Sequence, residues 1–151
     1  ATYSALINVH AKACDIAGSI RWLNAAEQLG LIPNEISYSP VIHACAQTGD
    51  IAKAASLLDQ MLVSSIVPNV VTYTSLIQCY LKTEDLTTAT HIFKDMYARD
   101  CAPNIATFNM LLNHFADRAD CSSVLAWFGE MVAMRLAPNV VSYTTIIKCY
   151  S

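Results

Sequence analysis

Charged residues and glycines are scarce in this sequence. Only 14% of its 151 residues are charged, and glycine occurs four times. No glycine-rich phosphate loop, nucleophile motif or cluster of carboxylates is present, so we expect neither catalysis nor a cofactor. No apolar run reaches the ~18 residues that a membrane-spanning helix requires, so we expect no membrane contact. A basic, apolar N-terminal leader is also missing.

The cysteines and histidines show none of the spacings of a metal site or a redox motif. No C-x-x-C pair occurs, and no two histidines form an i, i+4 pair. Free cysteine behaves as a small apolar side chain. We therefore expect reduced and largely buried thiols, without zinc or disulfides, at Cys14, Cys45, Cys79, Cys101, Cys121 and Cys149.

What the sequence does contain is one dipeptide at a constant interval. Pro-Asn occurs at residues 33–34, 68–69, 103–104 and 138–139, always 35 residues apart. An aromatic residue follows four positions after each Asn. A fixed period of this length indicates stacked repeats rather than one globular core.

The period divides the chain without insertions. We expect a single array over residues 1–151, made of repeats 1–34, 35–69, 70–104 and 105–139 and a partial repeat, 140–151. Because the sequence begins without Met and the array stops early in its fifth repeat, we expect a piece of a longer protein.

Each repeat carries two apolar stripes with helical spacing. The first follows i, i+3, i+4 and i+7, as at Tyr73, Leu76, Ile77 and Tyr80, and a longer stripe begins at Leu86. The expected fold class is all-α, a right-handed α-solenoid of stacked helix-turn-helix repeats. The recurring aromatics belong to the first stripe, so we expect core packing for Tyr3, Tyr38, Tyr73, Phe108 and Tyr143.

Helix starts are indicated by two further periodic series. Asp15, Asp50, Asp85 and Asp120 precede the second helix of each repeat, where a carboxylate accepts free backbone N–H groups. We expect the first helices to be capped equivalently by Thr2, Ser37, Thr72, Thr107 and Ser142.

Stacked repeats leave apolar faces open at the two ends of an array. No capping helix is evident at either end of this sequence. We therefore expect the chain to self-associate through its terminal helices.

The motifs resemble those of one repeat family. The segment Val-Val-Thr-Tyr-Thr-Ser-Leu-Ile at 70–77, the late methionines Met61, Met96 and Met131, and the closing Pro-Asn are similar to the pentatricopeptide repeat consensus. The resemblance covers the whole chain. It implies modular binding of single-stranded RNA, one base per repeat.

The family resemblance assigns base recognition to two residues of each repeat. With the residue after each Asn counted as position one, they are the fifth and the last. In this sequence they are Ser4 with Asn34, Ser39 with Asn69, Thr74 with Asn104, and Asn109 with Asn139; Thr144 begins a further pair. Ser or Thr with Asn resembles an adenine reader, and Asn with Asn a reader of cytosine over uracil. The implied target is 5′-A-A-A-(C/U)-3′.

The resemblance also implies contacts beside the base edge. Second-position residues sandwich each base, here Ala1, Ile36, Val71, Ala106 and Val141. Lys12 and Lys82 match the position from which the family contacts phosphate, whereas Gln47 and Asp117 interrupt that series. With a net charge of −3, we expect modest affinity and a weak dependence on salt.

Three uses of such an array stay open. The first is sequence-specific RNA binding in organellar RNA metabolism (stability, processing, splicing, editing or translation), in a mitochondrion or chloroplast. The second is a protein–protein interaction scaffold, a common role of helical solenoids. In the third, the array guides RNA to an enzyme whose catalytic domain lies outside these residues.

Overall fold

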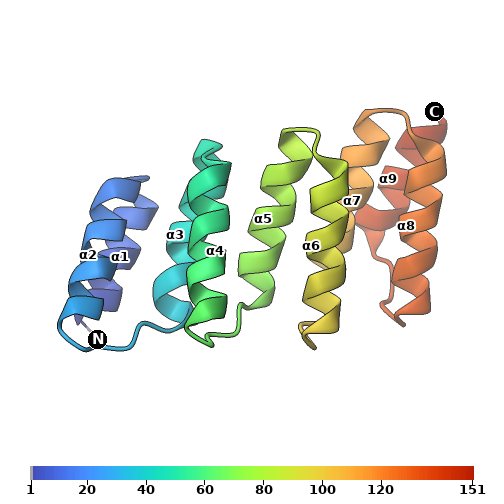
Figure 1. The fold of residues 1–151 in the computed structure, drawn as a ribbon. Helices are drawn as coiled ribbons and strands as arrows, with labels where there is room; N and C mark the ends of the chain where they lie inside the picture. Colours follow the sequence, from blue (N-terminus) through green and yellow to red (C-terminus); the bar gives the residue numbers. More distant parts are fainter. Residues whose placement is uncertain (1) are drawn as a thin grey trace. The chain divides into compact units, whose positions relative to one another are not determined.

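The computed structural model describes residues 2–151, and these residues form nine α-helices and no strand (Figure 1). The helices are α1 (Thr2–Lys12), α2 (Ile16–Gln28), α3 (Glu35–Thr48), α4 (Ile51–Val63), α5 (Val70–Lys82), α6 (Leu86–Ala98), α7 (Ile105–Asp117), α8 (Cys121–Ala133) and α9 (Val140–Tyr150). Two helices per 35-residue repeat are therefore confirmed for the described part. None of these helices has both the length and the hydropathy that crossing a membrane demands.

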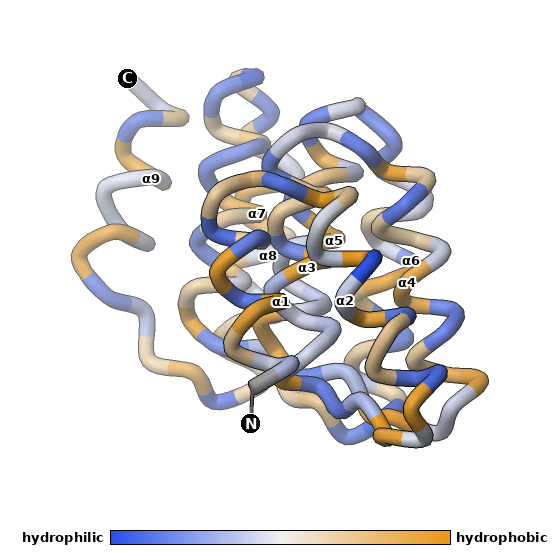
Figure 2. The backbone as a smooth tube through the Cα atoms, turned by 90° about the vertical axis from the view of Figure 1, so that its left-hand side faces the viewer, coloured by the Kyte–Doolittle hydropathy of each residue, from blue (hydrophilic) through white to orange (hydrophobic). Residues whose placement is uncertain are grey.

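The chain divides into two compact units, residues 1–101 with α1 to α6 and residues 102–151 with α7 to α9. In the first unit, α1, α3 and α5 form one layer and α2, α4 and α6 form the other (Figure 2). The helices α1, α3 and α5 each pack on their own second helix, and α3 also packs on both α1 and α5. In the second unit, α7 and α8 both pack on α9. We call the helices α1, α3, α5, α7 and α9 the first helices and the others the second helices.

The core of the first unit runs through successive repeats without a break. One cluster of buried side chains extends from Ile7 on α1 to Leu76 on α5, with Tyr38 and Met61 between them. Each first helix is therefore buried by contacts with more than one repeat, as the sequence predicts for a stack.

The periodic aromatic residues pack as expected where neighbouring helices cover them. Tyr38, Tyr73 and Phe108 are fully buried. The Tyr38 hydroxyl donates a 2.7 Å hydrogen bond to Glu27 Oε1. Burial, then this bond, raises the pKa of Tyr38 above its usual range, and burial with the nearby Asp95 raises that of Tyr73 to about 12. Tyr143 on α9 is 53% exposed, so the core packing expected for this residue is not found.

The predicted caps of the second helices are confirmed. The side chains of Asp15, Asp50, Asp85 and Asp120 each accept a hydrogen bond from the backbone N–H three residues later. Asp85 and Asp120 also accept from a hydroxyl, Thr88 Oγ1 at 2.6 Å and Ser123 Oγ at 2.7 Å. These side-chain and backbone bonds lower the pKa of both carboxyl groups.

The predicted caps of the first helices are wrong. The capping residues are Asn34, Asn69, Asn104 and Asn139, whose backbones are extended and whose side chains accept from the N–H three residues later. The donors are Ser37, Thr72, Thr107 and Ser142, which we expected to be the caps. The side chain of Thr2 lies outside the described residues. An Asn one turn earlier takes the cap because its carbonyl reaches the third N–H of the helix.

The expectation of uniformly reduced cysteines is also wrong. Cys121 and Cys149 form a disulfide that joins the start of α8 to the end of α9, with a Cα–Cα distance of 5.7 Å. The packing of α8 on α9 brings together two residues that are 28 apart in sequence. Cys45 and Cys79 are free and buried, as expected, and burial raises the pKa of Cys45 to about 11.

Left-handed residues end the helices, and they recur with the same period. One series is Cys14, Gly49, Glu84 and Ala119, and the other is Gly30, Ser65, Asp100 and Arg135, all with φ between 56° and 79°. At each place the next N–H bonds back to the helix, as Asp50 N does to Cys45 O at 2.9 Å. Only two of the eight positions carry glycine, the residue that adopts this conformation at least cost.

Ala119→Gly should therefore stabilise the protein. Ala119 has φ 56°, and relieving its left-handed strain should raise the free energy of unfolding by about 1 kcal/mol. Urea denaturation followed by circular dichroism measures the change. The matched control is Ala126→Gly in the exposed middle of α8, which should lower it by about 1 kcal/mol. A loss of stability with Ala119→Gly would contradict the assignment of strain.

Candidate functional site

The predicted reading residues lie at the starts of the first helices, and the structure brings two of the pairs into contact. Ser39 Oγ on α3 lies 3.5 Å from Asn69 Oδ1 at the start of α5. In the second unit, Asn109 Nδ2 donates a 3.1 Å hydrogen bond to Asn139 Oδ1. The fifth and last residues of these repeats, 30 residues apart in sequence, therefore form one polar site.

The other two predicted pairs are placed less directly. Ser4 Oγ lies 3.2 Å from Ser37 Oγ, which lies 3.5 Å from Asn34 Oδ1. Thr74 belongs to the first compact unit and Asn104 to the second, so their pairing stays a prediction. Thr144 is exposed on α9.

A third residue joins both of the directly paired sites, and the sequence analysis does not predict it there. Thr72 Oγ1 lies 2.7 Å from Ser39 Oγ and donates a 3.1 Å bond to Asn69 Oδ1. In the second unit, Ser142 Oγ donates a 2.6 Å bond to Asn109 Oδ1 and lies 3.2 Å from Asn139 Oδ1. The sequence signal for this residue is Ser or Thr at position three of every repeat, a pattern that by itself predicts helix capping.

The capping bond orients the Asn side chain at each site. Asn69 Oδ1 accepts from the Thr72 backbone N–H at 3.0 Å as well as from the Thr72 hydroxyl. The carbonyl oxygen is thus engaged by the helix, whereas Asn69 Nδ2 makes no hydrogen bond with the described residues. Since Asn69 is exposed, its two amide hydrogens are the groups available to a ligand.

Exposed apolar side chains follow each Asn by two residues. Ile36 is 62% exposed and Val71 57%, in the first turns of α3 and α5. Ala106 and Val141 occupy the same place on α7 and α9 and are also exposed. Ala1, the remaining predicted sandwich residue, lies outside the described residues. Each polar site with a described second-position residue thus has an apolar surface beside it that the core does not use.

The predicted phosphate-contacting lysines lie at the opposite ends of the first helices. Lys12 ends α1 and Lys82 ends α5, and both are exposed. Neither makes an ion pair with a described residue. Asp117, at the equivalent place on α7, pairs with Lys148 of α9, and this pairing lowers the pKa of Asp117. The free positive charge of this series therefore belongs to the first unit.

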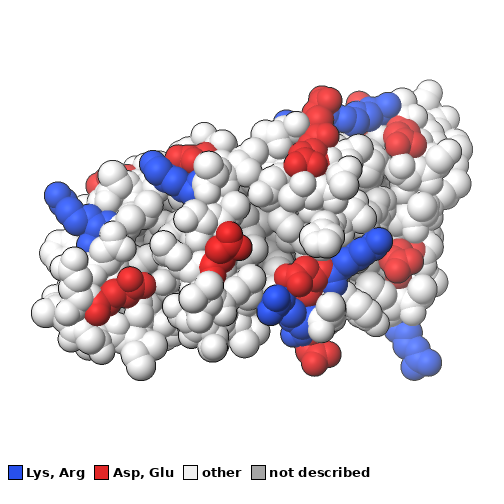
Figure 3. Space-filling model, in the orientation of Figure 1, with Lys and Arg blue, Asp and Glu red and all other residues white. Residues whose placement is uncertain are grey.

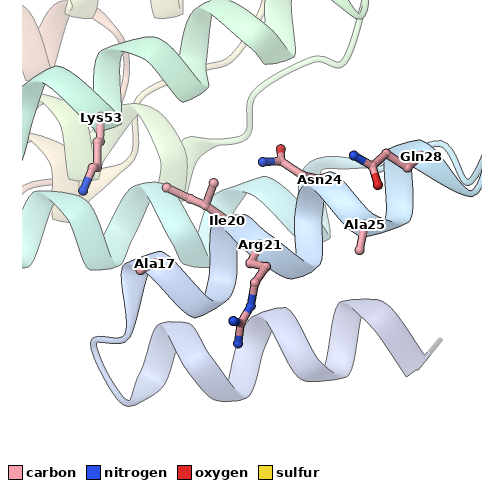
Figure 4. Close-up of a pocket in the computed structure, with 7 residues that line it drawn as sticks. All are labelled: Ala17, Ile20, Arg21, Asn24, Ala25, Gln28 and Lys53. Atoms are coloured by element: carbon pink, nitrogen blue, oxygen red, sulfur yellow. The ribbon is translucent and has the colours of Figure 1, made fainter.

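The second helices offer a different surface. A groove there is lined by Lys53 of α4 and by six residues of α2, among them Arg21, Asn24 and Gln28 (Figure 4). Lys53 pairs with Asp50 at 3.3 Å. Figure 3 shows basic and acidic side chains interspersed over this face, without a continuous basic patch. None of the predicted reading residues lines the groove, and no cluster suited to a metal ion occurs among the described residues.

Comparison with known proteins identifies the repeat. The family model described as "PPR repeat family" matches residues 33–82, 68–117 and 103–151. No curated protein matches the chain.

Solved structures share the fold. Pentatricopeptide repeat protein PPR10, a maize protein, in complex with an 18-nt psaJ RNA element has a TM-score of 0.82 at 22% identity over 98% of this chain. The PPR domain of protein-only RNase P 1 from Arabidopsis thaliana, in complex with tRNA, has a TM-score of 0.78 at 19% identity over 95% of this chain and 76% of its own. The present chain spans about a fifth of the PPR10 chain, 22%. These likenesses confirm the expected α-solenoid fold class.

Proposed function

Because family models cover residues 33–151, this chain belongs to the pentatricopeptide repeat family, and we propose that it binds single-stranded RNA sequence-specifically, one base per repeat. The observation that carries the proposal is the recurring site in which the fifth residue of a repeat meets the Asn that caps the next first helix. RNA in the structures of PPR10 and of the RNase P domain supports RNA as the ligand.

The site formed by Ser39 and Asn69 suits adenine. The free Nδ2 hydrogens of Asn69 match a base acceptor such as adenine N1, and a lone pair of Ser39 Oγ matches the exocyclic amine beside it. Guanine and uracil present the opposite order, with an N–H next to a carbonyl oxygen. Cytosine shares the donor–acceptor order of adenine, and the family code selects adenine for Ser with Asn.

The site formed by Asn109 and Asn139 presents mainly donors. Asn109 Oδ1 already accepts from Ser142, and Asn139 Oδ1 accepts from Asn109 Nδ2 and from the Ser142 backbone. The remaining hydrogens of the two Nδ2 groups match the adjacent acceptors N3 and O2 of cytosine. Uracil places a donor between its two carbonyl groups, which favours cytosine at this position.

The full proposed target is 5′-A-A-A-(C/U)-3′, with the repeats forming one continuous array. The pairs Ser4 with Asn34 and Thr74 with Asn104 are assigned by their positions in the repeat, and Thr144 would begin the next site. Val71, Ile36 and their equivalents sandwich the bases, because exposed aliphatic surface beside each reader gains from covering a base. Lys12 and Lys82 contact phosphate.

The process served is RNA metabolism in a mitochondrion or chloroplast, as the family resemblance implies. In this proposal the chain sequesters, protects or presents a transcript. The described residues hold repeats only, so any catalytic role would belong to a domain outside them. A protein-interaction scaffold is the competing function that the first experiment tests.

Self-association is a second part of the proposal. Tyr143, Ile147 and Tyr150 on α9 are 53%, 68% and 61% exposed. Large apolar side chains gathered on one helix favour contact with another apolar surface. A second copy of the chain offers the same apolar surface, so two copies can form a symmetric dimer through their α9 helices.

Fluorescence anisotropy with labelled RNA tests the main proposal. The chain should bind an RNA that contains AAAC more tightly than poly-G or poly-U of equal length. Affinity should fall only weakly with added salt, since few cations meet the phosphates. Equal or absent binding to all three RNAs would favour the scaffold function.

Asn69→Asp should change the base preferred at the second position from adenine to guanine. Aspartate keeps the helix cap, but a carboxylate oxygen replaces the Nδ2 donor and accepts from guanine N1–H. The ratio of guanine to adenine affinity should rise roughly tenfold or more, since a bond to a charged group is worth about 1.5–3 kcal/mol. Gln60 is exposed on α4, away from the site. Gln60→Glu makes the same change in charge and should leave the ratio of guanine to adenine affinity unaltered. An unchanged preference with Asn69→Asp would contradict the assignment.

Sedimentation velocity across a concentration series tests self-association. The chain should shift toward a dimer as its concentration rises, and Ile147→Glu should restore the monomer by placing charge on the exposed face of α9. Glu130 is exposed on α8. Glu130→Gln serves as a control for altered charge and should leave self-association unchanged. A purely monomeric profile at high concentration would refute this part.

A further inference from the structure

The third position of every described repeat junction holds a buried hydroxyl group. Thr72, Thr107 and Ser142 are completely buried, and Ser37 nearly so. Burying a hydroxyl is unfavourable unless it is hydrogen-bonded. At each of these residues the backbone N–H alone already satisfies the Asn cap, at distances from 2.9 to 3.2 Å. Ser142 also accepts from the Asn139 backbone N–H at 3.2 Å and so completes a capping box. The Thr72 hydroxyl makes no such bond to the described Asn69 backbone, so this buried hydroxyl has another role.

The contacts of Thr72 show what its hydroxyl does. It lies 2.7 Å from Ser39 Oγ and 3.1 Å from Asn69 Oδ1, whereas Ser39 Oγ and Asn69 Oδ1 are 3.5 Å apart. Thr72 thus stands between the two proposed base readers and makes a shorter contact with each than they make with one another. It belongs to the following repeat, so a junction is needed to complete the site.

Each hydroxyl group has one proton, which decides the donor and the acceptor of each bond in the Ser39–Thr72–Asn69 cluster. Thr72 Oγ1 donates its single proton to Asn69 Oδ1 at 3.1 Å, so the 2.7 Å contact between the two hydroxyl groups requires Ser39 Oγ to donate to Thr72 Oγ1. Both hydroxyl protons then stay within the cluster. Ser39 then has only lone pairs to offer a base, and Asn69 has only its Nδ2 hydrogens.

The other junctions repeat the arrangement with different readers. Ser142 donates to Asn109 Oδ1 at 2.6 Å and lies beside Asn139 Oδ1. Ser37 lies 3.2 Å from Ser4 Oγ and 3.5 Å from Asn34 Oδ1. A third-position hydroxyl bridges the fifth and last residues wherever one compact unit contains the whole site.

We propose that the third-position hydroxyl of the following repeat is a positioning residue for base specificity: Thr72 commits Ser39 to accepting hydrogen bonds, and Ser142 commits one carbonyl lone pair of Asn109. This inference rests on the proposed function. It extends the reading site from two residues to three and makes the third a determinant of which bases are rejected. Guanine and uracil are rejected at the Ser39 site because their carbonyl oxygens would face a lone pair.

Thr72→Val tests the inference at the second base. Valine keeps the shape but leaves the Ser39 proton free to reach guanine O6 or uracil O4. Affinities are measured for four RNAs in which the second base of AAAC is A, C, G or U. The ratio of adenine to guanine affinity should fall roughly fivefold to tenfold, the worth of one hydrogen bond. Thr72→Ser should restore the original ratio because it restores the hydroxyl.

Thr88→Val is the matched control. Thr88 Oγ1 also bonds a capping side chain, Asp85 Oδ2 at 2.6 Å, but on α6 among the second helices. Its loss should lower stability without altering the ratio. If Thr72→Val does not fold, Ser142→Ala provides the same test in the second compact unit, where the preference of the fourth base for cytosine over uracil should weaken.

The outcomes are distinguishable. An unsubstituted chain that prefers no RNA contradicts the proposed function and this inference with it. A base preference that persists in Thr72→Val, or that Thr72→Ser fails to restore, overturns the inference alone. A ratio that falls equally in Thr88→Val also overturns it, because the change would then follow from stability.

Discussion

The hydrogen bond from a backbone N–H to the Asn side chain at the start of each described first helix from α3 onward is the interaction on which the rest of the site depends. Without it, the first turn of α5 would leave a donor unsatisfied, at a cost of about 1 kcal/mol. With it, the carbonyl oxygen of Asn69 is fixed toward the helix and the amide hydrogens are left over. One local requirement of helix formation therefore sets the polarity of the group that is offered to a ligand.

Stacking supplies the rest of the geometry. Ser39 comes from one first helix and Asn69 and Thr72 from the next, and the buried cluster from Ile7 to Leu76 holds these helices together. Tyr38 and Met61 are fully buried in that core. Buried side chains therefore hold neighbouring first helices side by side. This packing brings the small polar side chains near the helix starts within contact distance of one another.

Periodicity in the sequence is enough to predict the helices and the Asp caps, because each depends on residues within one turn or one stripe. The caps of the first helices were assigned wrongly because Asn69 and Thr72 are both good capping residues and lie three positions apart. The disulfide between Cys121 and Cys149 had no local signal, since only the packing of α8 on α9 brings the two together. The pairing of Ser39 with Asn69 came from family resemblance, and the role of Thr72 required the distances.

The double use of the capping Asn limits how such a site can be altered. Only a few side chains, chiefly Asn, Asp, Ser and Thr, satisfy the N–H groups at a helix start. A leucine or lysine at residue 69 would weaken α5 whatever it offered to a base. The alphabet available for redesigning recognition at this position is therefore short, and it is set by the chemistry of helix ends rather than by the chemistry of nucleic acids.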